Sequence, residues 1–226
     1  LKKIKTKHEI LTKNLVKDKE LVIGSIRDPH SYYLSLWSYG CEKRGGLRDR
    51  LCGKSSNIKP MIKLIFSNSN FNLFDFNIYK NKRWNYLYSD INNYNNFREW
   101  LYLINDKKSF FDTCLPISDE MDNGMFLGFY TRRFINQYFN FKISNSKKII
   151  YNSLNSYVNS WIYLNKINES LNLAISKVKQ YENKINQNIK ISDKKINQSK
   201  HRALSYYYDD KTKKYISKLD KFIIKI

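Results

Sequence analysis

Residues 21–37 read Leu21-Val-Ile-Gly-Ser-Ile-Arg27-Asp-Pro-His-Ser-Tyr-Tyr-Leu-Ser35-Leu-Trp37, and this stretch predicts a strand that passes directly into a helix. The apolar run 21–26 is typical of a buried strand. Asp28 offers an N-cap and Pro29 suits the first helical position. Arg27 is therefore expected beside the free N–H groups of a helix N-terminus. A planar guanidinium next to such groups favours the binding of an anion such as phosphate.

Ser35 lies eight residues after Arg27 and shares a helix face with Asp28, Ser31 and Tyr32. A strand that ends in Arg-Asp-Pro, with Ser eight residues after the Arg, resembles the 3′-phosphate-binding motif of the sulfotransferases that use 3′-phosphoadenosine 5′-phosphosulfate (PAPS). The alternative interpretation is a strand-to-helix turn that binds no ligand, because so short a motif also recurs by chance.

Three further segments, one before this stretch and two after it, stand in the order that the bacterial sulfotransferases would require. Lys5-Thr-Lys-His8 resembles the Lys-Thr-His strand end that carries the family's catalytic base. Ile167-Asn-Glu169-Ser-Leu171 resembles the family's Arg-x-Glu-x-Leu element without its Arg. Asn197-Gln-Ser199-Lys-His-Arg202 resembles the late loop that contacts the nucleotide. Together these segments extend the resemblance over almost the whole chain.

The resemblance implies a role for each matched residue. Arg27 and Ser35 would hold the 3′-phosphate of the co-substrate PAPS, and Ser199, Lys200 and Arg202 would close over the same phosphate. His8 would be the catalytic base, because its ordinary pKa suits proton abstraction near neutral pH, with Glu9 as the alternative. The acceptor would be a hydroxyl or amine of a glycan or small molecule. No metal is expected, since the three histidines are scattered and the cysteines lack zinc-site spacing.

The expected fold is α/β: a P-loop-like sulfotransferase fold with a partly parallel central sheet flanked by helices, forming a single domain over residues 1–226. A glycine-rich loop for the 5′-phosphosulfate is not found, because no glycine precedes Gly24 and Gly45-Gly46 lies between charged residues. The chain begins with Leu1. We therefore expect either a fragment that lacks its first strand and phosphate loop, or a degenerate member of the family.

The formal net charge of +21 suggests polyanionic partners. The second hypothesis is accordingly a non-catalytic basic protein that binds nucleic acid or anionic glycan. A dispersed lysine bias is the favoured explanation of the charge, because the lysines form no long block, and it makes nucleic acid the less favoured partner. The cysteines, Cys41, Cys52 and Cys114, are expected to be reduced thiols, which favours the cytoplasm. The sequence has no apolar run of transmembrane length.

The remaining pattern predicts further elements in the same alternation of strands and helices. A helix is expected over 94–104, with Asn95 or Asn96 as its N-cap. A second helix is expected to begin after Gly124 and to run to about Phe139. Two more are expected over 170–185 and over 206–224, the latter as one closing helix. A short helix is expected over 9–20, a strand over 160–164, and polar loops over 41–60 and 185–195. The segment 68–81 is expected to be a short strand or irregular.

Overall fold

The computed structural model is α/β in the part of the chain that it describes: mostly helical, with a small parallel sheet of two strands. It describes residues 22–52, 82–106, 127–139, 156–181 and 200–226. The elements expected over 9–20, 68–81 and 185–195 lie outside these ranges.

The described residues fall into two compact units. The first comprises residues 22–29, 127–139, 156–181 and 217–226, and the second comprises 30–52, 82–106 and 200–216. Each unit is thus assembled from segments far apart in the sequence. The expectation of a single domain over residues 1–226 stays a prediction.

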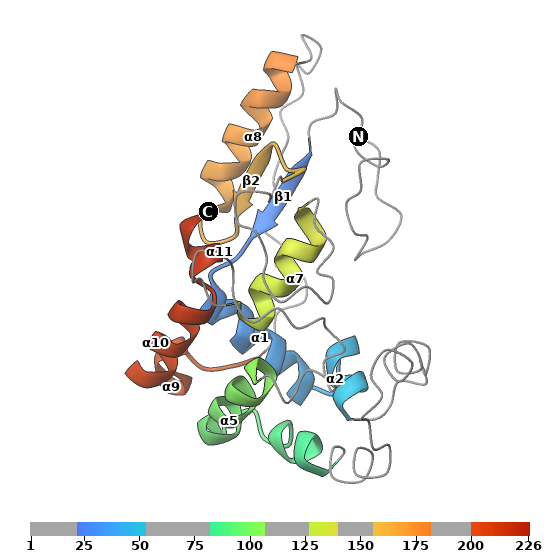
Figure 1. Ribbon diagram of the computed structural model, residues 1–226, viewed down its shortest axis with the longest axis vertical. Helices are drawn as coiled ribbons and strands as arrows, with labels where there is room; N and C mark the ends of the chain where they lie inside the picture. Colours follow the sequence, from blue (N-terminus) through green and yellow to red (C-terminus); the bar gives the residue numbers. More distant parts are fainter. Residues whose placement is uncertain (1–21, 53–81, 107–126, 140–155, 182–199) are drawn as a thin grey trace, which may run out of the picture. The chain divides into compact units, whose positions relative to one another are not determined.

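The first unit contains the predicted strands as a parallel pair. β1 (Ile23–Ile26) lies beside β2 (Ser160–Tyr163), with Ile23 opposite Ser160 and Ile26 opposite Tyr163 (Figure 1). A parallel pair needs a long crossover connection, and more than a hundred residues separate these strands in the sequence. Both strands run in the same direction, so their carboxyl ends lie at the same edge of the sheet.

Two helices pack against this strand pair. α8 (Ile167–Tyr181) follows β2 after a short turn and runs alongside it (Figure 1). Ser170 ties the two elements together, because its hydroxyl accepts a hydrogen bond from the Tyr163 N–H at 3.0 Å. α7 (Phe129–Tyr138) contributes Phe134, whose ring stacks on Trp161 of β2 at 5.1 Å. Aromatic side chains of α7 and the buried side of α8 therefore pack against the strand pair.

The C-terminal segment holds the N-terminus of α7 within the same unit. The Asp220 carboxylate is fully buried and accepts hydrogen bonds from the N–H and the hydroxyl of Thr131, at 2.9 and 2.6 Å. Leu219 accepts a further bond from the Gly128 N–H at 2.7 Å. These contacts occupy donors that a helix N-terminus leaves without intrahelical partners. α11 (Lys221–Lys225) follows directly after Asp220.

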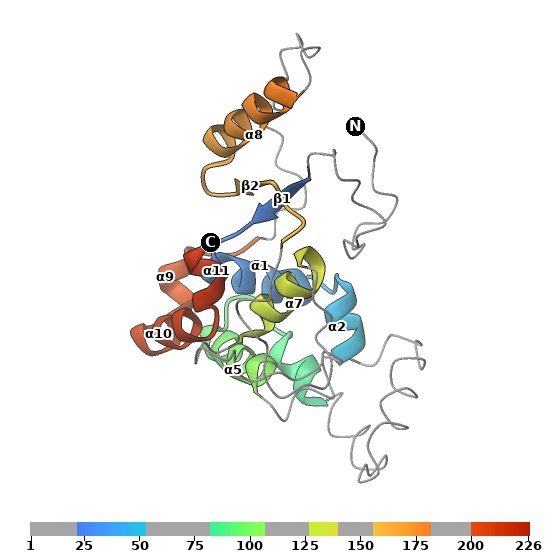
Figure 2. The same ribbon diagram turned by 45° about the horizontal axis from the view of Figure 1, so that its top comes forward.

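The second unit is helical and has an aromatic core. α1 (Pro29–Cys41) contributes Trp37, which is fully buried and meets the Phe97 ring edge-to-face at 5.3 Å. Phe97 lies on α5 (Tyr94–Asn105), next to α9 (Leu204–Tyr207) (Figure 2). The other helices of this unit are α2 (Gly46–Leu51), most of α10 (Asp210–Leu219) and residues 82–87.

Three sequence-based expectations about these helices are wrong. The predicted polar loop over 41–60 contains α2, which begins after Gly45, a residue with the positive φ of 99° that glycine tolerates. α5 is capped by Asn93, whose side chain accepts from the N–H groups of Asn95 and Asn96. The closing helix expected over 206–224 is divided into α9, α10 and α11.

Candidate functional site

The turn between β1 and α1 is the candidate anion site. Arg27 directly follows β1, and Pro29 is the first residue of α1, as the sequence predicts. Arg27 and Asp28 are half-buried. The carboxyl end of β2 lies at the same edge, because the Leu164 N–H donates to the Ile26 carbonyl at 3.0 Å. The carboxyl edge of parallel strands is where α/β proteins usually bind their ligands.

Tyr130 of α7 fixes this turn and was not anticipated from the sequence. Its hydroxyl accepts a hydrogen bond from the Arg27 N–H at 3.1 Å. The backbone of Arg27 is thereby held in place at the point where the chain leaves the sheet. The pairing joins residues that are 103 positions apart, so local sequence patterns carry no sign of it.

The other predicted phosphate ligands that the structure describes belong to the second unit, whereas Arg27 belongs to the first. Ser35 lies half-buried in α1, and Lys200 and Arg202 are exposed in the segment before α9. The prediction that these residues meet Arg27 at one phosphate stays a prediction. His8, Glu9 and Ser199 lie outside the described residues.

Glu42, the residue after α1, binds the segment that precedes α9. The Glu42 carboxylate accepts a hydrogen bond from the Lys200 N–H at 2.8 Å and also binds the Arg44 side chain. The Lys200 N–H, followed by Arg44, lowers the pKa of Glu42 below its usual value. Glu42 therefore contacts the predicted late loop, and no local sequence pattern indicated this contact. The Arg202 guanidinium lies over the Tyr206 ring at 4.5 Å.

Glu169, the acidic residue of the Arg-x-Glu-x-Leu resemblance, lies in the first turn of α8. Its side chain is 78% exposed and forms a long ion pair with Lys166, at 4.0 Å. A carboxylate near a helix N-terminus complements the positive end of the helix dipole. This position gives Glu169 a structural role at the start of α8.

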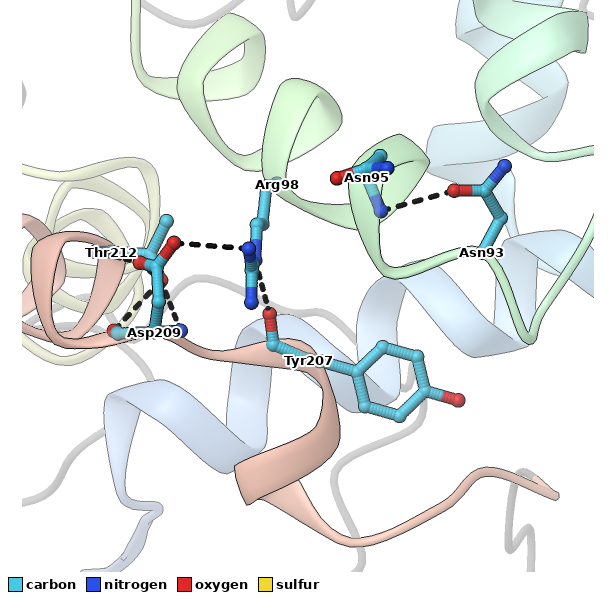
Figure 3. A network of polar contacts seen from close by, with 6 residues as sticks. All are labelled: Asn93, Asn95, Arg98, Tyr207, Asp209 and Thr212. Atoms are coloured by element: carbon cyan, nitrogen blue, oxygen red, sulfur yellow. Dashed lines mark hydrogen bonds and ion pairs between the residues drawn. The ribbon is translucent and has the colours of Figure 1, made fainter.

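A polar network in the second unit orders the start of α10. Arg98 of α5 donates to the Tyr207 carbonyl at 2.8 Å and pairs with Asp209 at 3.0 Å (Figure 3). Asp209 in turn accepts from the N–H and the hydroxyl of Thr212, both at 2.7 Å, and its own N–H donates to that hydroxyl. This reciprocal arrangement is a capping box. It explains why a new helix begins after Asp209.

The network predicts a pH-dependent contribution to stability. The Thr212 N–H and hydroxyl, and more weakly Arg98, lower the Asp209 pKa below its usual value of 3.8. The stabilisation is thus present above the unfolded-state pKa and lost as the pH falls through the folded-state pKa. We expect Asp209→Asn, which preserves a cap, to cost about 0.5–1 kcal/mol at neutral pH because this side chain is partly exposed.

Urea unfolding followed by circular dichroism at pH values from neutral to acidic measures this difference. The parent and the Asp209→Asn variant are expected to converge in their free energy of unfolding as the pH falls through the lowered pKa of Asp209. A difference that stays constant across the whole range would show that the charge of Asp209 contributes nothing.

The described cysteines, Cys41 and Cys52, are free thiols, and neither is suited to nucleophilic chemistry. Burial, aided by the nearby charges of Asp90 and Glu42, raises the pKa of the Cys41 thiol to about 12. A thiol with so high a pKa remains protonated at neutral pH, whereas the thiolate is the reactive form. Cys52 is buried. Within the described ranges, no three potential metal-ligating side chains from His, Cys, Asp and Glu gather at one point.

No protein-family model, curated protein or solved structure matches the chain significantly. The candidate site therefore stands on its own residues and geometry. None of the helices in the described part of the chain has both the length and the apolar character needed to span a membrane.

Proposed function

We propose that this protein is a PAPS-dependent sulfotransferase that holds the adenosine 3′-phosphate at the turn between β1 and α1. The observation that carries the proposal is the position of Arg27: it directly follows a parallel strand and lies two residues before the start of α1. The order of the motifs in the sequence adds to this support. The P-loop-like arrangement of the whole sheet is part of the proposal.

The proposed recognition depends on complementary charge and geometry. A guanidinium binds phosphate through two parallel N–H donors, and such charge-assisted bonds are about twice as strong as neutral ones. The N-terminus of α1 adds the partial positive charge of the helix dipole. Tyr130 keeps the Arg27 backbone in place by accepting its N–H. The 3′-phosphate would therefore bind to a turn whose backbone is already ordered.

The remaining roles come from the resemblance. Ser35, Ser199, Lys200 and Arg202 would also hold the 3′-phosphate. The acceptor oxygen or nitrogen would bond to sulfur as the bond between sulfur and the 5′-phosphate oxygen breaks, releasing adenosine 3′,5′-bisphosphate. His8 would take the acceptor proton, with Glu9 as the alternative base. Such an in-line transfer requires mainly positioning and charge neutralisation.

Calorimetric titration with two nucleotides tests the proposal. Adenosine 3′,5′-bisphosphate carries the 3′-phosphate, whereas adenosine 5′-monophosphate lacks it and is otherwise the same. We expect the bisphosphate to bind about tenfold or more tightly, since hydrogen bonds to charged groups contribute about 1.5–3 kcal/mol. Equal affinity for the two nucleotides, or no binding of either by the folded chain, would overturn the proposal.

A further inference from the structure

Two arginines and two tyrosines form a continuous row in the second unit, which we call the Arg–Tyr strip. The Arg202 guanidinium lies 4.5 Å from the centre of the Tyr206 ring. Tyr206 meets Tyr94 edge-to-face at 5.8 Å, and the Arg98 guanidinium lies 4.7 Å from the centre of the Tyr94 ring. Two neighbouring aromatic rings, each with a guanidinium over it, therefore lie at the start of α5 and in the segment around α9.

Hydrogen bonds hold this strip in a fixed arrangement. The Tyr206 hydroxyl donates to the Asn92 carbonyl at 2.8 Å. Arg98 is held by the Tyr207 carbonyl and by Asp209, the contacts shown in Figure 3. Because these contacts restrict the side chains before any ligand arrives, binding would lose less conformational entropy than at a mobile surface.

The strip is accessible and positively charged. Tyr94 is 39% exposed, Tyr206 is half-buried, and Arg202 is exposed. Among the residues that the structure describes, the Arg202 guanidinium makes no ion pair, so its charge is available to a ligand. The surrounding segment 200–216 carries five Lys and Arg residues against two acidic residues, and one of the acids, Asp209, is already paired with Arg98.

We propose that the Arg–Tyr strip binds single-stranded nucleic acid, a function beyond the proposed sulfuryl transfer. Proteins that bind single strands combine basic groups for the phosphates with aromatic side chains on which bases stack. An arginine that lies over an aromatic ring forms a cation–π pair with it, and a base can stack next to that pair. An anionic glycan would also be attracted by the charge, but it has no aromatic rings to match the two tyrosines. The pair of rings, each with a guanidinium over it, therefore favours nucleic acid.

Fluorescence anisotropy with a labelled oligothymidine of about 12 nucleotides tests this inference on the full chain. We expect Tyr94→Ala and Tyr206→Ala each to weaken binding about tenfold, because a base loses its stacking partner. Tyr86→Ala is the matched control, since Tyr86 is a 60% exposed tyrosine of the same unit that lies outside the strip. This control is expected to bind within about twofold of the parent.

Two further measurements separate stacking from general charge attraction. Arg202→Lys retains the charge but loses the planar group, so we expect weaker oligothymidine binding with an unchanged dependence on salt. Labelled heparin is expected to bind the parent and the tyrosine variants alike. The inference is wrong if the tyrosine variants bind oligothymidine as the parent does, or if they lose heparin binding to the same extent. Binding of adenosine 3′,5′-bisphosphate should be unaffected by Tyr94→Ala, so this inference and the proposed function can fail separately.

Discussion

Trp37→Ala is expected to lower the free energy of unfolding by about 3–5 kcal/mol, the usual cost of removing a large buried aromatic side chain. Trp37 is fully buried at the centre of the second unit. Its indole N–H donates to the Leu87 carbonyl at 3.0 Å, and its ring meets those of Phe97 and Tyr207 at 5.3 and 5.7 Å. The truncation would leave a cavity and an unpaired carbonyl. Native domains have only about 5–15 kcal/mol of stability, so this variant is expected to be severely destabilised.

Urea unfolding followed by circular dichroism measures this effect. Tyr86→Ala serves as the control, because Tyr86 is an exposed aromatic residue of the same unit. Trp37→Phe should give an intermediate loss, since it retains an aromatic ring but cannot donate to Leu87. A loss for Trp37→Ala no larger than that for Tyr86→Ala would contradict the aromatic core described here.

Gly24→Val is expected to destabilise the first unit by about 1–3 kcal/mol or more through overpacking. Gly24 lies opposite Trp161 in the parallel pair. A Cβ atom at Gly24 would lie 2.5 Å from Trp161 Cζ3 and 2.9 Å from Val158 Cγ2. Trp161 has little freedom to withdraw, because its ring packs against those of Phe134 and Tyr138. The strand before Arg27 therefore requires glycine at this position.

A double-mutant cycle with Trp161→Leu tests the cause of this loss. If the indole is the obstacle, Gly24→Val should cost less in the Trp161→Leu background than in the parent. Thermal or urea unfolding of the four proteins gives the coupling. Additive losses would mean that the valine is excluded by something other than the Trp161 ring.

The sequence predicted the elements whose signals are local. The strand before Arg27 and the helix from Pro29 are indicated by a short apolar run, an Asp and a Pro within a few residues, and the structure has β1 and α1 there. The strand expected over 160–164 is confirmed as β2, and the spacing of apolar residues predicted α5 to within one residue at its end. The parallel pairing supports the α/β class, whereas the sulfotransferase fold remains a proposal.

The elements that the sequence missed depend on contacts between distant residues. The apolar period continues through 206–224. A new helix nevertheless begins after Asp209, because Asp209 accepts from the Thr212 N–H as its N-cap. Asp220 accepts a hydrogen bond from the Thr131 N–H at the start of α7. Of the candidate site, the sequence predicted the strand-to-helix turn that carries Arg27. It did not predict the Tyr130 and Glu42 contacts, because each joins segments more than a hundred residues apart.

Calorimetric titration of Arg27→Ala with adenosine 3′,5′-bisphosphate tests the central claim most directly. Arg83→Ala is the matched control, because Arg83 is an exposed arginine whose ion pair with Glu99 is expected to contribute little. We predict that Arg27→Ala weakens binding of the bisphosphate about tenfold or more and reduces its preference over adenosine 5′-monophosphate. Arg83→Ala should behave as the parent. Equal affinities for the Arg27→Ala and Arg83→Ala proteins would contradict a 3′-phosphate site at the β1–α1 turn.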